Sequence, residues 1–310
     1  MLFLRKLVVV KSGRWMFPWL FLWLFLWLLA GCPGQRIRSA QRVRALEDVV
    51  YVPSSTHPKQ QLDLYLPTDR RDFPMVLFVH GGFWRNQDRR YYQAFTGLHG
   101  NVGVALAQRG IGVAVQSYRL IPEATLEDQL RDVASAARFV VEHAQEYGGS
   151  QRLVLVGFSA GGHLVMSLCV DRERLRRAGV DPSLVRGCVA ISGVLDLVAM
   201  AAQQDAEFNR EVTFRHFGAT TEQQAQHSPI ARISTQTPPL LLLWAEKDYP
   251  FVKQAGQAAV EKLKSLGIAP IAHELAGHDH ADMVLRINTS DDRLTERLAP
   301  FVDSHTKPQP

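Results

Sequence analysis

Short apolar runs alternate with longer amphipathic stretches along most of this chain. The apolar runs predict eight strands, at about 47–52, 61–66, 75–80, 112–118, 152–157, 187–192, 240–245 and 268–275. The later runs are nearly continuous Val, Leu and Ile, the pattern of parallel strands covered on both faces. The stretches between them predict helices, at about 98–109, 124–147, 160–170, 251–266 and 281–304. This alternation predicts a layered α/β domain with a mostly parallel, doubly wound sheet of about eight strands.

Two stretches break the alternation. Residues 84–100 are polar and aromatic and follow a strand directly, and residues 196–239 separate two strands without a core strand of their own. Long insertions at the strand ends of α/β folds usually build the substrate site. We therefore expect 196–239 to form a helical cap. Three phenylalanines of this segment either line a pocket or pack the cap against the core: Phe208, Phe214 and Phe217.

The first 31 residues have the pattern of an export signal. A basic stretch precedes an unbroken apolar run over 16–29, and Leu29-Ala30-Gly31-Cys32 follows. This order of regions defines a secretory signal, and its last four residues resemble the bacterial lipobox, in which the cysteine is acylated. We expect an exported, membrane-anchored lipoprotein with lipid on Cys32, a tether over 32–45 and the α/β domain over 46–305. An uncleaved signal anchor is the alternative, although the run is short for the ~20 residues of a membrane span.

The distribution of charge argues against nucleic-acid binding. The chain of 310 residues has a formal net charge of +5, and its leader has four basic and no acidic residues. Five minus four leaves about +1 for everything after the leader, so the body of the protein is near neutral. Such a body lacks the basic excess that binds phosphate backbones. The basic residues of the leader are Arg5, Lys6, Lys11 and Arg14.

Two further cysteines lie inside the predicted domain. Cys169 falls on a predicted helix and Cys188 in a predicted strand. We interpret both as small core residues, and a disulfide between them stays open for an oxidising compartment. Neither has the spacing of a metal or redox motif.

The segment Gly157-Phe158-Ser159-Ala160-Gly161 joins a buried strand to a helix. A serine at the apex of such a sharp turn projects its hydroxyl from the sheet edge, and its flanking glycines let the strand and helix approach closely. The N–H of Ala160 would then be free to bind an oxyanion. The alternative is an ordinary glycine-rich turn.

A serine needs a base to take its proton and a third group to orient that base. We expect Asp248, in the turn after 240–245, to be the acid, with Glu246 as a competitor. Asp248 could instead be a turn acid or a helix cap. We expect His280, after the strand that ends near 275, to be the base, with His278 as its rival. A metal held by His278, His280 and Asp282 is disfavoured, because no second ligand cluster appears.

The oxyanion donors are expected after the strand at 75–80, in His80-Gly81-Gly82-Phe83-Trp84. Glycines at a strand end let backbone N–H groups point at a developing negative charge, and one such donor contributes about 3–4 kcal/mol. The N–H groups of Gly82 and Phe83 are the candidates, together with that of Ala160. His80 is expected to bond the backbone and shape this loop. A plain glycine turn is the alternative.

The motifs His-Gly-Gly-x-Trp and Gly-x-Ser-Ala-Gly-Gly-His-Leu resemble the esterase branch of the α/β-hydrolase superfamily. The chain is similar there to kynurenine formamidases, isoprenylcysteine methylesterases and bacterial acetyl/feruloyl esterases, over about 60–290. The resemblance implies an α/β-hydrolase fold with Ser159 as nucleophile, Asp248 as acid and His280 as base. Three further segments carry it: Ser117-Tyr118-Arg119-Leu120, Glu146-Tyr147-Gly148-Gly149 and Ser192-Gly193-Val194-Leu195-Asp196.

We therefore expect a serine hydrolase that cleaves small or aryl carboxylic esters through an acyl-enzyme on Ser159, without metal or cofactor. Its expected partner is a small-molecule ester. An arylformamidase-like amide hydrolase is one alternative, but formamidases of tryptophan catabolism are cytosolic and this leader indicates export. A non-catalytic, membrane-tethered binding protein on the same fold is the other alternative. Cleavage of long-chain lipids is disfavoured, because the cap has no long apolar lid.

Overall fold

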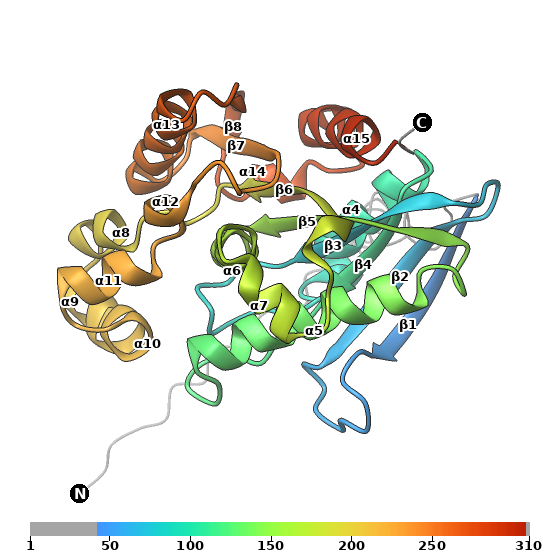
Figure 1. Ribbon diagram of the computed structural model, residues 1–310, viewed down its shortest axis with the longest axis horizontal. Helices are drawn as coiled ribbons and strands as arrows, with labels where there is room; N and C mark the ends of the chain where they lie inside the picture. Colours follow the sequence, from blue (N-terminus) through green and yellow to red (C-terminus); the bar gives the residue numbers. More distant parts are fainter. Residues whose placement is uncertain (1–41, 308–310) are drawn as a thin grey trace, which may run out of the picture.

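The computed structural model describes residues 42–307, in which one sheet is covered by helices on both faces (Figure 1). The strand order is β1-β2-β4-β3-β5-β6-β7-β8. Strand β2 runs antiparallel to both of its neighbours, and all other pairs are parallel. The strands are β1 (Val43–Val50), β2 (Gln61–Pro67), β3 (Phe73–Val79), β4 (Gly112–Gln116), β5 (Gly149–Phe158), β6 (Val185–Ile191), β7 (Leu240–Lys247) and β8 (Ile271–Asp279). The mostly parallel, eight-stranded sheet expected from the apolar runs is confirmed.

The two faces of the sheet bury separate sets of apolar side chains. Alternate residues of β5 divide between them: Leu153 and Leu155 join one cluster, while Val154 and Val156 join the other. This is the period-two alternation of a strand covered on both sides. The first face is covered by α5 (Leu126–His143), α6 (Ala160–Val170) and α13 (Pro250–Ser265), and the second by α4 (Leu98–Ala107), α14 (Asp282–Leu285) and α15 (Arg293–His305).

The last predicted helix is wrong as a single element. The pattern over 281–304 predicts one helix, but the structure divides it into α14 and α15. Between them, Asn288 has a left-handed backbone (φ 61°), a conformation that a helix interior excludes. The second helix then starts anew at Asp292, whose side chain accepts a hydrogen bond from the N–H of Thr295 (2.9 Å). A local cap therefore overrides a continuous apolar period.

The start of the domain also differs from the expectation. Strand β1 begins at Val43, so the last residues assigned to the tether over 32–45 belong to the sheet. They pair with β2, for example Val43 with Pro67 and Arg44 with Leu66. The predicted signal, the lipidation site Cys32 and the rest of the tether lie outside the described residues. Within residues 42–307, no helix is long and apolar enough to cross a membrane.

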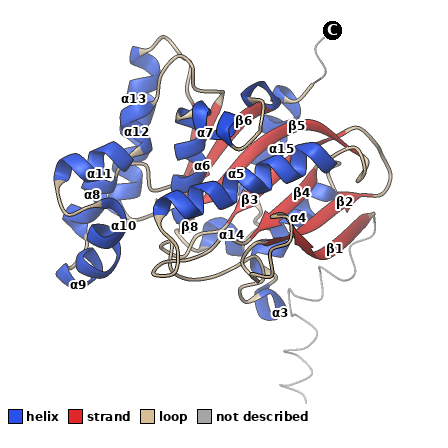
Figure 2. Ribbon diagram, turned by 60° about the horizontal axis from the view of Figure 1, so that its bottom comes forward, coloured by secondary structure: helices blue, strands red, loops and turns tan. Residues whose placement is uncertain are grey.

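The segment between β6 and β7 forms the expected helical cap. Figures 1 and 2 show its short helices gathered together, on the far side of the molecule from β1. Phe217 is fully buried, Phe208 is half-buried, and Phe214 is 41% exposed. The helices are α8 (Leu197–Gln203), α9 (Ala206–Phe208), the π-helical turn η2 (Asn209–Phe214), α10 (Arg215–Phe217), α11 (Thr221–His227) and α12 (Pro229–Arg232).

The remaining helices are short and lie on the connections. They are α3 (Gln93–Thr96), α7 (Arg172–Arg177) and the 3₁₀ turn η1 (Pro182–Leu184). The two domain cysteines are buried, as expected, and they form a disulfide between α6 and β6, Cys169–Cys188. Both cysteines are therefore core residues, as expected. The disulfide between them, which the sequence left open, is present in the structure.

Candidate active site

Ser159 lies at the apex of the turn between β5 and α6, with a φ of 54°. Its flanking glycines are sterically required. A Cβ on Gly157 would lie 2.2 Å from the carbonyl oxygen of Gly161, and a Cβ on Gly161 would lie 2.1 Å from that of Val79. Both distances are far below van der Waals contact, so no other residue fits. The backbone thus holds Ser159 in a strained conformation at the carboxyl end of the strand.

The structure brings Ser159, His280 and Asp248 together from three separate strand ends. The distance from His280 Nε2 to Ser159 Oγ is 3.1 Å, and that from His280 Nδ1 to Asp248 Oδ1 is 2.7 Å. A carboxylate can only accept hydrogen bonds, so Nδ1 carries the proton. In the neutral imidazole, Nε2 is then the acceptor that faces the hydroxyl of Ser159. This is the arrangement in which a serine can lose its proton as it attacks.

The carboxylate of Asp248 is held by further donors. It accepts hydrogen bonds from the N–H groups of Ala245 (3.1 Å) and Tyr249 (2.9 Å) and from the hydroxyl of Ser192. Burial on its own would raise the pKa of Asp248, but the hydrogen bond and charge of His280, helped by these donors, outweigh it and lower that pKa. The group therefore stays ionised and fixed in orientation.

The competing residues lie outside this hydrogen-bonded line. Glu246 is exposed and accepts a hydrogen bond from the N–H of Gly277 (2.7 Å). His278 is buried at the end of β8, and its Nδ1 lies 3.0 Å from the carbonyl oxygen of Ala276. Across residues 42–307, no three His, Cys, Asp or Glu side chains are grouped so as to hold a metal ion.

Two aromatic rings flank the imidazole of His280. The ring of Phe158 lies 5.0 Å from it and the ring of Tyr249 lies 4.8 Å from it, centroid to centroid. Tyr249 also stacks on Phe251 at 5.4 Å. Since ring contacts of this kind restrict the rotation of a side chain, they help to keep both nitrogens of His280 on their partners.

The loop after β3 passes directly over the serine. A Cβ on Gly81 would lie 3.0 Å from Ser159 Cβ. Gly82, Phe83 and Trp84 all have positive φ, at 98°, 51° and 59°. The N–H of Arg85 closes the turn by donating to the carbonyl of Gly82 (3.2 Å). No hydrogen bond formed within residues 42–307 uses the N–H of Gly82 or Phe83, so both donors are available.

Ala160 completes the set of expected donors. It is the first residue of α6, where N–H groups have no acceptor within the helix. His80, at the start of the same loop, places Nδ1 2.8 Å from the carbonyl oxygen of Gly81, as expected for a residue that shapes the loop. Burial lowers the pKa of His80 to about 3, so its ring is neutral.

Trp84 holds the strained loop in place. A left-handed backbone at two consecutive aromatic residues costs roughly 1–3 kcal/mol each, so neighbouring contacts must compensate. Trp84 is 0% exposed and packs edge-to-face against Phe217 of the cap, with ring centroids 4.7 Å apart. Its carbonyl accepts hydrogen bonds from the N–H of Ile121 (3.0 Å) and from Gln129 Nε2 (2.8 Å). The cap therefore supports the donors through Trp84.

Sequence reasoning did not assign a role to Ser192 or to Trp84. Both were present in the quoted motifs, and Ser192 follows the carboxyl end of β6, beside the nucleophile strand. Its position at a strand end was the available signal. Of the two roles left open for the cap phenylalanines, the structure shows packing for two of them: Phe217 packs the cap onto the core, and Phe208 meets Phe83 edge-to-face at 5.1 Å. Phe214 is 41% exposed.

Comparison with known proteins agrees with the resemblance drawn from the motifs. The chain is 28% identical over 245 residues to a probable isoprenylcysteine alpha-carbonyl methylesterase of Arabidopsis thaliana, covering 74% of this chain and 50% of that protein. It is 25% identical over 265 residues to kynurenine formamidase of Salmo salar, covering 83% of each. The chain thus spans about half the length of the plant relative.

Solved structures share the fold. Esterase B from Lactobacillus rhamnosis has a TM-score of 0.72 at 19% identity, covering 93% of this chain and 96% of that chain. A hyperthermophilic esterase from the archaeon Pyrobaculum calidifontis has a TM-score of 0.68 at 20% identity, covering 90% of each. The model of the BD-FAE family matches residues 62–263. The α/β-hydrolase fold is therefore confirmed, and the chain belongs to the BD-FAE family.

Proposed function

We propose that this protein is a serine hydrolase of carboxylic esters. The observation that carries the proposal is the hydrogen-bonded line from Ser159 through His280 to Asp248, set beside backbone donors without acceptors. The kinship with methylesterases and the fold shared with several esterases support it. The substrate is a small ester, since the cap over 196–239 has no long apolar run that could serve as a lipase lid.

The mechanism follows from the protonation states of the three groups. Ser159 Oγ attacks the ester carbonyl while His280 Nε2 takes its proton, and Asp248 stabilises the imidazolium that forms. The N–H groups of Gly82, Phe83 and Ala160 bind the oxyanion. The intermediate collapses as the alcohol leaves with the proton from Nε2, and an acyl-enzyme remains. Water then attacks the acyl group and gives a proton to Nε2. The second tetrahedral intermediate collapses as Nε2 returns that proton to Ser159 Oγ, which releases the acid and restores the free serine and the neutral histidine.

Replacement of the nucleophile tests the proposal. Ser159→Ala should remove turnover of a short p-nitrophenyl ester by about 10⁴-fold or more and abolish labelling by a fluorophosphonate probe. Ser167→Ala is the matched control, because Ser167 lies on the same helix and its hydroxyl bonds only the carbonyl of His163 (2.8 Å). Labelling that persists in Ser159→Ala would contradict the assignment of Ser159 as the nucleophile, and no labelling of the wild type would favour the non-catalytic alternative.

An amide or formamide hydrolase is the second candidate. The formamidase relative, which matches along 83% of its own length, supports it. The same serine, histidine and carboxylate would act, with an amine as the leaving group. Rates on N-formylkynurenine and phenyl acetate, measured on one preparation, separate the two: an ester hydrolase should prefer phenyl acetate.

We also propose that the protein is exported and anchored by lipid on Cys32. The lipobox-like sequence supports this, and the disulfide Cys169–Cys188 is of the kind that persists in oxidising compartments. Cys32→Ser should block processing, so that the protein stays larger than the mature form. A mature protein of unchanged size that still partitions with the membrane would overturn the proposal. An unprocessed wild type would favour a signal anchor.

A further inference from the structure

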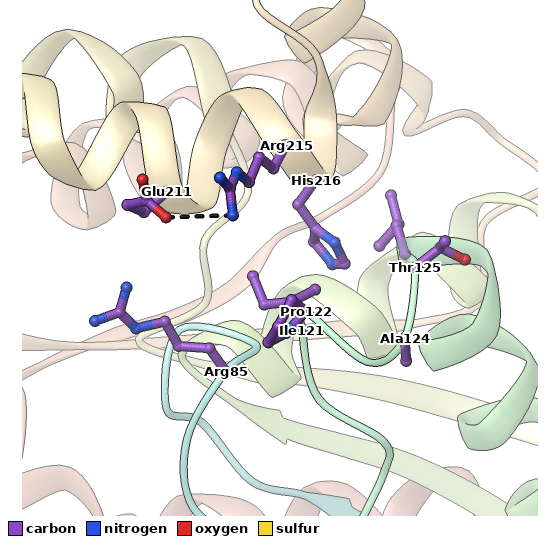
Figure 3. Close-up of a pocket in the computed structure, with 9 residues that line it drawn as sticks. Arg85, Ile121, Pro122, Ala124, Thr125, Glu211, Arg215 and His216 are labelled. Atoms are coloured by element: carbon purple, nitrogen blue, oxygen red, sulfur yellow. Dashed lines mark ion pairs between the residues drawn. The ribbon is translucent and has the colours of Figure 1, made fainter.

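A pocket of about 430 Å³ lies between the loop after β3 and the cap (Figure 3). We call it the Arg85 pocket. Figure 3 shows its charged side chains at one end and Ala124 and Thr125 at the other. The pocket does not include Ser159, His280 or Asp248 among its lining residues. They are Arg85, Ile121, Pro122, Ala124, Thr125, Leu126, Glu211, Arg215 and His216.

The pocket adjoins the oxyanion donors through the chain itself. Arg85 is the last residue of the turn that begins at Gly82, and a closed turn of this kind keeps its end Cα atoms within about 7 Å. Phe83, inside that turn, touches Phe208 of the cap, one turn before Glu211 of the pocket wall. A group bound beside Arg85 therefore lies next to the turn that carries the N–H groups of Gly82 and Phe83.

The pocket wall is hydrogen-bonded to the same turn. The carbonyl of Trp84 accepts from the N–H of Ile121 (3.0 Å) and from Gln129 Nε2 (2.8 Å), and Gln129 Oε1 lies 3.0 Å from His216 Nε2. Because an amide oxygen accepts, His216 donates from Nε2. These bonds tie the wall and the oxyanion donors into one unit, so a ligand held in the pocket is also held relative to Ser159.

The charge is positive at the end of the pocket that holds Arg85, Glu211 and Arg215 (Figure 3). Glu211 is the acidic residue that lines the pocket, and two arginines already pair with it: Arg210 at 3.2 Å and Arg215 at 3.3 Å. Arg85 is an exposed arginine, and none of the ion pairs among residues 42–307 involves it. Three arginines against one glutamate leave a charge of +2, with the guanidinium of Arg85 free to bind an anion.

Three acidic residues within or next to the lining segment 121–126 have partners of their own. Glu123 pairs with His57 at 2.8 Å, Asp128 pairs with Arg131 at 3.1 Å, and Glu127 pairs with Arg174. His216 adds no charge at neutral pH, since burial lowers its pKa to about 3.

We propose that the Arg85 pocket binds the remote carboxylate of an anionic ester, with the guanidinium of Arg85 as its partner. This inference rests on the proposed function and names its substrate class. Ile121, Pro122 and Ala124 supply an apolar surface for the carbon chain or ring between the carboxylate and the ester group. A planar guanidinium matches a carboxylate with two parallel hydrogen bonds, which selects for that group over a neutral one.

The test compares matched esters that differ in the remote charge. One pair places it on the acyl side, 4-nitrophenyl hydrogen glutarate against 4-nitrophenyl valerate. The other places it on the alcohol side, 4-acetoxybenzoate against 4-methylphenyl acetate. In the wild type, the charged member of one pair should have the lower KM. Arg85→Gln should raise that KM about tenfold more than the KM of its neutral partner, with a much smaller change in kcat.

Controls separate charge from shape. Arg85→Lys should recover part of the preference, because the charge returns without the fork geometry. Arg177→Ala removes an exposed arginine of α7, outside the Arg85 pocket, and should leave the preference as in the wild type. Added salt should weaken the preference, since the guanidinium is exposed to solvent.

A preference for the charged ester that Arg85→Gln leaves unchanged, or no preference in either pair, would overturn the inference while ester turnover still upholds the proposed function. If no ester is cleaved, calorimetry decides independently. Two ligands are used, monomethyl glutarate for the acyl side and 4-acetoxybenzoate for the alcohol side. Ser159→Ala should bind at least one of them about tenfold more tightly than Ser159→Ala/Arg85→Gln does. Equal binding of both ligands by the two variants, or no binding of either, would overturn the inference on its own.

Discussion

The strand-end loops carry Ser159 and its partners, the cap packs against the loop after β3, and the two regions are built differently. In the loops after β5, β7 and β8, backbone and side-chain hydrogen bonds fix the position of each reactive group. The cap consists of short helices that meet the core through ring contacts such as Phe217 on Trp84, together with separate hydrogen bonds such as that of His216 to Gln129. Hydrogen bonds have narrow geometry, whereas aromatic packing tolerates changes of shape. Under the proposed function, the strand ends of the sheet would position the reacting groups, and the cap would shape the substrate site.

The largest effect should come from breaking the hydrogen bonds that join Ser159, His280 and Asp248. His280→Ala should reduce kcat about 10⁴- to 10⁶-fold, because no imidazole is left to take the proton of Ser159. The double variant Ser159→Ala/His280→Ala should have a kcat only slightly lower than that of His280→Ala. His278→Gln is the control, since His278 bonds the carbonyl of Ala276 and lies outside the line. Steady-state rates on a short p-nitrophenyl ester measure both. An equal loss in the two variants would make the base assignment wrong.

The next effect tests the cap. Phe217→Ala should lower the free energy of unfolding by about 3–5 kcal/mol, because it leaves a cavity against Trp84 and His163. Since Trp84 then loses its support, kcat should also fall. Phe214→Ala removes an exposed ring and should change stability by less than about 0.5 kcal/mol. Denaturant unfolding and ester turnover are measured together. A destabilised Phe217→Ala with full kcat would show that the cap does not support the oxyanion loop.

Buried histidines in both regions should make the protein sensitive to acid. Burial lowers the pKa of His80 and His216 to about 3 and that of His99 and His163 to about 4. Below the unfolded value of 6.5, the unfolded chain binds protons that the folded protein does not. The free energy of unfolding should therefore fall from pH 6.5 towards pH 4, by up to about 1.4 kcal/mol per pH unit for each histidine.

Denaturant unfolding at pH 7.5, 6.5 and 5.5 measures this loss. The variant His216→Gln removes one of the four groups while keeping a donor for Gln129, and so should reduce the slope by about a quarter. Stability that stays constant from pH 7.5 to pH 5.5 would contradict the expectation.

The smallest effect concerns Ser192. Ser192→Ala removes one of the hydrogen bonds that keep Asp248 ionised, so the pKa of Asp248 should rise and kcat should fall about tenfold. The acidic limb of the pH profile of kcat/KM should move to higher pH, a shift that a merely structural defect would not produce. Ser167→Ala again serves as the control. An unchanged profile would limit Ser192 to a packing role.

Much of this molecule could be predicted from its sequence, because local rules are strong there. The apolar runs predicted each strand. Gly157 and Gly161 predicted the sharp turn, since a Cβ at either position would clash with the neighbouring backbone. The order of serine, acid and base along the chain is the order that the resemblance to α/β hydrolases implies, with each residue in a loop after a strand. A single helix over 281–304 was wrong, because the cap at Asp292 is a local signal that the apolar period hides.

The tertiary structure shows which of two neighbouring candidates contacts the other site residues. His280 and His278 stand two positions apart, and the difference is which of them faces Ser159 and Asp248. The bond between Cys169 and Cys188, the partnership of Ser192 with Asp248 and the support of Trp84 by Phe217 join residues far apart in the chain. By itself, the sequence determined the elements and the kind of chemistry. Which residues contact each other depended on the tertiary structure, because the packing of the sheet and helices fixes the direction of each side chain and the distance between side chains.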